Sequence, residues 1–303
     1  MESNVTVTPK LSYSETAVRY RTIVIDGLDI FYREAGKPGN PVILLLHGFP
    51  SSSHMYRDLI NDLSDRYHLI APDYPAFGHS AMPSQDEYNY TFDHLSVTIE
   101  KFIDALLLKK FSMYIQDYGS PVGFRIAVRR PELIQALLIQ NGNAYEEGLG
   151  PAMEGGKQFW ANRNTETENV MRGALTPAGT KWQYTEGAGD LSKISPDGWS
   201  YDQYFLDRPG NDAIQLALLY DYRTNPPLYP VWQEYLRVHQ PPALITWGKN
   251  DLFFTAAGAE AYLKDLPQAA LHLLNGGHFV LEEYHREIAD HIHRFLVKQG
   301  INS

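Results

Sequence analysis

The segment 115–119 reads Ile-Gln-Asp-Tyr-Gly and joins two different sequence patterns. Residues 111–116 form a run typical of a buried strand, and residues 119–129 are typical of a helix. A polar residue at so abrupt a strand-to-helix turn sits on strained backbone, with its side chain held above the edge of the sheet. The serine form of this turn is Gly-x-Ser-x-Gly, but no serine in the chain has glycine at both −2 and +2. Asp117 therefore takes the position of a nucleophile, although an aspartate at a helix start is also a common N-cap.

Strands and helices alternate on both sides of this turn. Asp26-Gly27 separates two short apolar runs and is a strong signal for a β-hairpin. Further apolar runs alternate with segments in which apolar residues recur at helical spacing, which predicts a parallel sheet covered on both faces. The predicted strands are 22–25, 30–33, 42–46, 69–71, 111–116, 136–140, 243–247 and 271–274, and the predicted helices are 54–63, 91–108, 119–129, 256–264 and 282–298.

The alternation stops between residues 144 and 239, where Gly, Asn, Thr, Trp and Tyr dominate and no strand-like run occurs. We expect residues 144–239 to form a mainly helical cap, inserted between two parts of one α/β core, residues 1–143 and 240–303. Such a cap would lie over the C-terminal edge of the sheet, which is where open α/β sheets bind ligands.

Three more polar segments follow predicted strands at that same edge. His47-Gly48-Phe49-Pro50 follows the third strand, and the backbone N–H groups of such a loop can face a developing negative charge. Asp251 and His278 follow the last two strands. Each segment alone would be an ordinary turn. Together with Asp117 they predict that an oxyanion loop, a nucleophile, an acid and a histidine base meet at one edge of the sheet.

These motifs, together with the segment 72–80 and Gly277-His278-Phe279, resemble the α/β-hydrolase superfamily across essentially the whole chain. An aspartate at the nucleophile position is similar to the branch of epoxide hydrolases and haloalkane dehalogenases. The resemblance implies an α/β-hydrolase fold, with a mostly parallel eight-stranded sheet, helices on both faces and an inserted mainly helical cap. It also implies a hydrolase that works without a cofactor and without a metal.

The same pattern assigns roles to the residues at the edge. Asp117 attacks a carbon atom of the substrate and forms an alkyl-enzyme ester. His278 then activates a water molecule, while Asp251 orients His278 and stabilises its cation. The backbone N–H groups of Phe49 and Tyr118 are expected to stabilise the oxyanion that forms when water attacks the ester.

The segment Asp221-Tyr222-Arg223 resembles the position of a lid tyrosine in epoxide hydrolases, which donates a proton to the epoxide oxygen. Those enzymes generally have a second lid donor, for which Tyr184, Trp160 and Tyr145 are open candidates. The side chains expected to line the substrate pocket are those of His47, Trp160, Tyr184 and Phe279.

The residues beside Asp117 leave two reactions open. Epoxide hydrolases usually have His before the nucleophile and Trp after it, where this chain has Gln116 and Tyr118. Gln before the nucleophile is more like haloalkane dehalogenases, which hold the halide with a Trp at the position of Tyr118. Tyr222, and the lack of Trp at 118, favour epoxide hydrolysis to a vicinal diol. The alternatives are dehalogenase-like hydrolysis of carbon–halogen bonds, or a weakly catalytic ligand-binding protein on this scaffold.

Composition excludes several other classes of protein. The net charge is −10 and there is no run of Lys or Arg, so the chain is a poor candidate for binding nucleic acid or an anionic membrane. The longest clean apolar run, 42–46, is too short to span a membrane. Without cysteine, the chain has no disulfide scaffold, thiolate metal site or Fe–S cluster.

Metal binding and export are not expected either. His285, His291 and His293 lie on one predicted helix, but positions 291 and 293 do not face the same way, which argues against a metal site. The first residues show no export pattern, so we expect a cytoplasmic chain. Its expected partners are a small apolar organic substrate and water, and its oligomeric state is left open.

Overall fold

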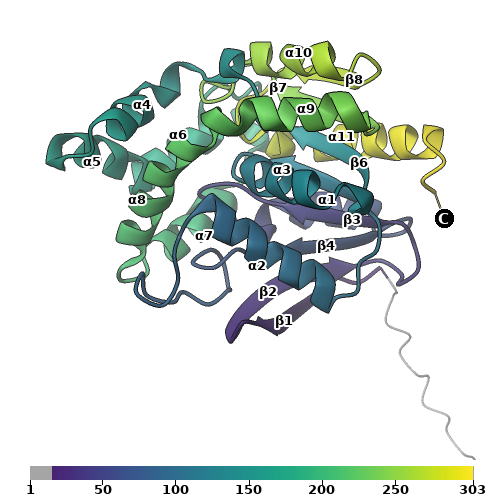
Figure 1. Ribbon diagram of the computed structural model, residues 1–303, viewed down its shortest axis with the longest axis horizontal. Coiled ribbons are helices and arrows are strands. Elements are labelled where there is room, and N and C mark those ends of the chain that lie inside the picture. The colour runs from purple at the N-terminus through teal and green to yellow at the C-terminus, as the bar shows by residue number, and fades with distance from the viewer. Residues whose placement is uncertain (1–15, 303) are drawn as a thin grey trace, which may run out of the picture.

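The computed structural model describes residues 16–302. In this part of the chain eight strands form one sheet, in the order β1-β2-β4-β3-β5-β6-β7-β8 (Figure 1). The hairpin β1–β2 turns at Asp26-Gly27, where both residues have positive φ, and β2 runs antiparallel to β4. All later neighbours, from β4 to β8, pair in parallel. The strands are β1 (Arg19–Ile25), β2 (Leu28–Ala35), β3 (Val42–Leu46), β4 (His68–Pro72), β5 (Phe111–Gln116), β6 (Ile134–Gln140), β7 (Ala243–Gly248) and β8 (Ala270–Leu274).

Helices cover both faces of this sheet. Side chains of α2, α3, α9 and α10 join one apolar cluster, and those of α1 and α11 join a second cluster on the opposite face. The helices that flank the sheet are α1 (Arg57–Leu63), α2 (Phe92–Ala105), α3 (Gly119–Arg129), α9 (Tyr229–His239), α10 (Ala256–Asp265) and α11 (Val280–Lys298). This arrangement confirms the predicted mostly parallel sheet with helices on both faces.

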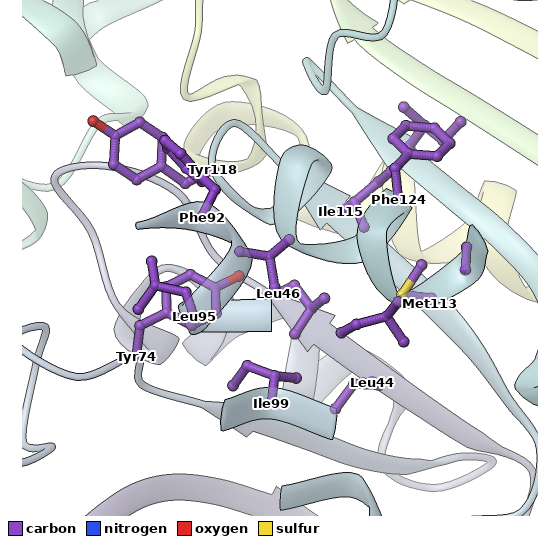
Figure 2. Packing of buried hydrophobic residues seen from close by; sticks show 14 of the residues in the cluster. Leu44, Leu46, Tyr74, Phe92, Leu95, Ile99, Met113, Ile115, Tyr118 and Phe124 are labelled. Carbon is purple, nitrogen blue, oxygen red and sulfur yellow. The ribbon is translucent and has the colours of Figure 1, made fainter. Parts of the chain in front are cut away.

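The central strands are apolar along their whole length because both of their faces are covered. In β3, Leu44 and Leu46 point into one cluster, whereas Ile43 and Leu45 point into the other. Figure 2 shows the first cluster, in which side chains of β3 and β5 lie among those of α2 and α3. The tight packing of these layers fixes the C-terminal ends of β3 and β5 relative to each other.

The segment between β6 and β7 is helical, as expected, and most of it gathers beside the sheet, at the left in Figure 1. Besides α9, whose bounds are given above, this segment contains α4 (Glu154–Ala161), α5 (Thr165–Arg172), α6 (Pro177–Thr185), α7 (Pro196–Leu206) and α8 (Asn211–Asp221). The last helix, α9, packs against α3 and α10 of the core. The division at residues 143 and 239 stays a prediction, and this packing favours a cap that ends before Tyr229.

Every predicted strand and helix is present, with ends that differ by up to three residues. The largest differences are at the hairpin, where β1 begins at Arg19, and at α2, which ends at Ala105. The predicted helix 54–63 begins as a 3-10 turn, Ser53–Tyr56, before it continues as α1.

One glycine makes the close approach of β3 and α3 possible. A Cβ atom on Gly119 would lie 2.1 Å from the backbone oxygen of Leu46, which cannot swing aside as a side chain can. We therefore expect Gly119→Ala to lower the free energy of unfolding by about 1–3 kcal/mol or more, as overpacking does. Gly173→Ala is the matched control, because its Cβ would meet nothing within 4 Å and its φ is −56°. Denaturant unfolding measures both, and equal stability of the two variants would contradict this account.

Candidate active site

Asp117 lies at the junction of β5 and α3 in a left-handed backbone conformation, with φ +48°. Such a conformation is costly for a residue with a Cβ atom. The loop after β3 lies directly against this turn, since a Cβ atom on Gly48 would come within 2.3 Å of the Asp117 Cβ. The fold therefore brings the predicted oxyanion loop and the predicted nucleophile into contact.

Two backbone N–H groups hold the Asp117 carboxylate. The Phe49 N–H donates to Oδ1 over 2.7 Å, and the Tyr118 N–H also hydrogen-bonds the carboxylate. Burial raises the pKa of Asp117 above its ordinary value, while His278 and these two N–H groups act in the opposite direction. The carboxylate is thus buried, and backbone N–H groups replace part of its lost hydration.

His278 lies between two carboxylates. Its Nδ1 is 2.8 Å from Asp251 Oδ2, and its Nε2 is 3.7 Å from Asp117 Oδ2, which is longer than a hydrogen bond. Burial alone would lower the pKa of His278, but the charges of Asp251 and Asp117 and the hydrogen bond to Asp251 outweigh it, so this pKa is raised. The ring is oriented by Asp251 and faces the nucleophile.

Asn141 is a functional neighbour that the sequence analysis missed. Its Nδ2 donates to Asp251 Oδ2 over 2.8 Å, and its backbone oxygen accepts the N–H of Asp117. The other Asp251 oxygen accepts the Phe253 N–H over 2.7 Å. Asn141 directly follows β6, so the rule that identified the other residues, a polar group just after a buried strand, would have found it.

Gln116 was noted in the sequence only as the residue before the nucleophile. In the structure its side chain is fully buried, and its amide nitrogen lies 3.2 Å from His278 Nε2. The ring nitrogen that faces Asp117 therefore also faces an amide group of the core.

A small cavity of about 70 Å³ lies over the Asp117 carboxylate. It brings Asp117, His278 and Tyr222 together, so three of the predicted catalytic side chains share one space. The Tyr222 ring stacks on Trp160, with centroids 5.4 Å apart and planes 9° from parallel. The remaining lining residues are Phe49, Tyr118, Ala152, Met153, Gly156, Met171, Ala174, Gln183, Leu219, Phe253 and Phe254.

Tyr222 is held in place from both sides along the chain. Asp221 accepts the N–H of Phe92 at the start of α2, over 2.8 Å. On the other side, the Arg125 guanidinium of α3 donates to Asn225 Oδ1 over 2.8 Å and to Thr224 Oγ1 over 3.3 Å. Tyr222, a cap residue that lines the cavity, is therefore anchored to helices of the core. The Tyr222 hydroxyl is itself hydrogen-bonded to that of Tyr229.

Three residues expected in the pocket lie outside the cavity. His47 is fully buried behind the loop, where its ring bonds to the Gly48 oxygen and accepts the Tyr74 N–H, and burial lowers its pKa to about 4. Tyr184 and Phe279 stack on each other at 3.9 Å on the other face of the sheet. These predictions fail because apolar aromatic residues also serve as packing elements, and sequence does not say which face they reach. Trp160 alone of the four lines the cavity.

The three candidates for a second lid donor are engaged elsewhere. The Tyr184 hydroxyl donates to Asp202, and the Tyr145 hydroxyl donates to Asp265 over 2.6 Å. The Trp160 indole N–H donates to the Leu219 oxygen over 2.8 Å.

The sequence model of the α/β hydrolase fold family matches residues 41–284. An uncharacterized hydrolase of Saccharomyces cerevisiae is 42% identical over 284 residues, which cover 92% of this chain and 97% of that protein. A cis-3-alkyl-4-alkyloxetan-2-one decarboxylase of Shewanella oneidensis is 27% identical, over 90% of this chain and 86% of that protein.

Haloalkane dehalogenases also match. Haloalkane dehalogenase 2 of Mycobacterium bovis is 39% identical over 101 residues, which cover 33% of this chain and 35% of that protein. Among solved structures, a variant haloalkane dehalogenase from Agrobacterium tumefaciens superposes with a TM-score of 0.78 at 21% identity, covering 94% of this chain and 99% of that one.

A parallel sheet with a nucleophile turn, a histidine and an acid at its C-terminal edge defines an α/β-fold hydrolase. The chain belongs to the α/β-hydrolase fold family. Within residues 16–302, no helix is long and apolar enough to cross a membrane, and no cluster of three His, Asp or Glu side chains could hold a metal ion.

The left-handed conformation of Asp117 has a measurable consequence for stability. We expect Asp117→Gly to be more stable than Asp117→Ala by about 1 kcal/mol, because glycine adopts this conformation without a steric penalty. At Ala213, an exposed position in α8, exchange to Gly should instead lower stability by about 0.5–1 kcal/mol. Thermal and denaturant unfolding measure all three. An alanine variant as stable as the glycine variant would show that the turn is not strained.

Proposed function

We propose that this protein hydrolyses epoxides to vicinal diols through a covalent ester on Asp117. The observation that carries the proposal is the cavity itself, in which the Asp117 carboxylate, the His278 imidazole and the Tyr222 phenol line one space of about 70 Å³. A carboxylate nucleophile, a base for the second step and a proton donor for the leaving oxygen are the three groups that this reaction needs.

The first step forms the ester. The Phe49 N–H holds Oδ1 of Asp117, which leaves Oδ2 to attack an epoxide carbon. A new carbon–oxygen bond forms to Asp117, and the epoxide carbon–oxygen bond breaks with its electron pair passing to the epoxide oxygen. Tyr222 gives its proton to that oxygen. The negative charge of Asp117 is thereby transferred to the Tyr222 phenolate.

The second step hydrolyses the ester. His278 removes a proton from a water molecule, and the resulting hydroxide attacks the carbonyl carbon of the Asp117 ester. The N–H groups of Phe49 and Tyr118 stabilise the oxyanion, and losing one such donor costs about 10²–10³ in rate. The ester bond then breaks, the diol oxygen takes the proton from His278, and the proton left on the Asp117 carboxyl returns to the Tyr222 phenolate.

Dehalogenation is the second candidate. At the level of the fold, the similarity to haloalkane dehalogenases supports both reactions equally. The two reactions need different groups in the cavity. A halide leaves as a stable anion and is held by hydrogen-bond donors, whereas an alkoxide needs a proton. Among the described residues that line the cavity, Trp160 has the one indole, and its N–H is already bonded to the Leu219 oxygen. A protonated phenol next to Asp117 therefore favours the epoxide.

A substrate screen with purified protein tests the proposal. Styrene oxide-type epoxides, short bromoalkanes and a cis-dialkyl oxetan-2-one are offered in parallel, and diol, halide, carbon dioxide and alkene are measured. Diol formation from the epoxides supports the proposal. Halide release alone would assign the dehalogenase reaction instead, and carbon dioxide with alkene alone would assign the reaction named for the Shewanella oneidensis relative.

Removing the Tyr222 hydroxyl should slow epoxide opening selectively. General acid help of this kind contributes about 10²–10⁴-fold, so we expect Tyr222→Phe to reduce the rate of diol formation within that range. Tyr204→Phe is the control, since this cap tyrosine is 72% exposed. Steady-state rates on one epoxide suffice. Diol formation within about threefold of the wild type in Tyr222→Phe would remove the acid role from this residue.

Removing the His278 imidazole should separate the two steps. In His278→Gln the first step still proceeds but hydrolysis of the ester is blocked, because no base activates water. Intact-protein mass spectrometry should then show an increase equal to the mass of the epoxide, located in the peptide that contains Asp117. The double variant Asp117→Ala/His278→Gln should show no increase. An adduct of the same size in this double variant would place the covalent bond on another residue.

A further inference from the structure

The Gln116 side chain has two polar atoms near His278, and only one of them has a partner. The side chain is fully buried, and its amide nitrogen lies 3.2 Å from His278 Nε2. Its amide oxygen is also buried and has no hydrogen-bond partner among the residues that the structure describes. Buried polar atoms in native proteins are nearly always paired. An unpaired acceptor beside the base therefore points to a second arrangement of this amide, in which the oxygen is used.

The observed orientation of the amide belongs to a neutral imidazole. His278 Nδ1 is 2.8 Å from Asp251 Oδ2, so the neutral ring carries its hydrogen on Nδ1 and donates it to the carboxylate. Nε2 then has a free electron pair, which accepts a hydrogen bond from the Gln116 amide nitrogen. If Nε2 carried a proton, this contact would set two donors against each other.

The surroundings of the Gln116 oxygen also favour a turn when His278 is charged. This oxygen and Asp117 Oδ1 lie 2.4 and 2.6 Å from the same point, the position that a Cβ atom on Gly48 would take. Two acceptors are therefore neighbours in the observed orientation. A half-turn of the amide exchanges its oxygen and its nitrogen, so that an N–H would lie on the Asp117 side and the oxygen would face Nε2.

We propose that Gln116 is a positioning residue whose amide turns over when His278 gains a proton, so that its oxygen replaces its nitrogen beside Nε2. Its part in ester hydrolysis rests on the proposed function. The turn itself depends only on the charge of the ring, and it would serve any reaction in which His278 removes a proton from water.

The amide exchanges hydrogen bonds but no proton during hydrolysis. Water replaces the Gln116 N–H at Nε2 and gives a proton to this nitrogen, while the hydroxide attacks the carbonyl carbon of the Asp117 ester. The Gln116 oxygen then accepts the new Nε2–H. When the diol oxygen takes that proton, the amide turns back. Since hydrogen bonds to charged groups are stronger than those to neutral groups, the amide favours the charged ring overall.

The other groups around the ring act on its charge in known directions. Asp251 after β7 and Asp117 after β5 face its two nitrogens and raise its pKa, and Tyr222 lines the same cavity. Gln116 is neutral, so replacing it changes the support of Nε2 without adding or removing a charge. Aromatic rings cover other sides of the imidazole, at centroid distances of 5.2, 5.8 and 5.3 Å for Phe253, Phe254 and Phe279.

The titration of His278 tests the turn without any substrate. The protein is labelled with ¹⁵N-histidine, and the His278 ring signals are assigned by their absence in His278→Gln and followed by NMR as pH changes. Gln116→Met fills similar space without a hydrogen bond. Its midpoint should fall by about 0.5–1 pH unit, because the cation loses its acceptor. An amide fixed in the observed orientation supports only the neutral ring, so its removal would raise the midpoint instead.

Gln215→Met is the matched control for this titration. Gln215 lies in α8, is fully buried and also has an amide oxygen without a partner among the described residues. Its amide nitrogen bonds to Asn211 rather than to His278, so this variant should leave the midpoint unchanged. Gln116→Glu keeps an acceptor and loses the donor, and it should raise the midpoint. Thermal unfolding checks that each variant is folded.

Rates of the two chemical steps connect the turn to the proposed reaction. With an epoxide that yields diol, the turnover rate and the fraction of quenched protein that carries the ester give the rate constants of both steps. We expect Gln116→Met to slow ester hydrolysis by about 5- to 20-fold, the effect of losing a hydrogen bond to a charged group. Ester formation should stay within about twofold, because His278 takes no proton in that step.

The outcomes for the two proposals differ. A midpoint in Gln116→Met that is unchanged or raised would overturn this inference, and so would an equal slowing of both steps. If Gln116→Met does not fold, a midpoint in Gln116→Glu that is not raised has the same force. If no epoxide yields diol but the midpoint falls as expected, the proposed function falls while the turn of the Gln116 amide stands.

Discussion

A buried carboxylate at the C-terminal edge of the sheet is the group on which the rest of the site depends. Removing a charged carboxylate from water is costly unless hydrogen bonds and opposite charges replace the lost solvation. At Asp117 the Phe49 and Tyr118 N–H groups and the nearby His278 supply part of that replacement, although burial still raises the pKa. This requirement brings the loop after β3 against the nucleophile turn, and it explains why Gly48, which leaves room for the contact, occupies its position.

The pair of His278 and Asp251 depends on a second electrostatic effect, the cost of charging a buried imidazole. A fully buried imidazole would stay neutral if it were alone, and the charge of Asp251 offsets that tendency. Asp251 in turn accepts hydrogen bonds from the Asn141 side chain and the Phe253 N–H. The ends of β5, β6 and β7 are therefore joined by one hydrogen-bonded chain, which runs from Asp117 through Asn141 to Asp251. In the proposed reaction this chain serves the hydrolysis of the ester.

In the proposed reaction the leaving group is protonated by a residue of the inserted segment. Tyr222 belongs to the inserted segment, yet Asp221 and Asn225 tie its neighbours to α2 and α3. In the proposed reaction these contacts with the core hold the proton donor at the cavity. The proposed function thus divides the site into a core that attacks and hydrolyses and a lid residue that protonates the departing oxygen.

Local sequence alone determined the sheet, the inserted helical segment and the residues that gather at its edge. Apolar runs and turn residues act over a few positions, so Asp117, Asp251 and His278 could be recognised from where they follow strands. Contacts across long sequence distances could not be read in this way. The aromatic residues Tyr184 and Phe279 turned to the far face of the sheet, and Asn141 became the support of the acid, because side-chain direction and neighbours are set by how the layers pack. Only the tertiary structure shows which buried polar atoms lack a partner, since an unpaired atom is defined by everything that surrounds it.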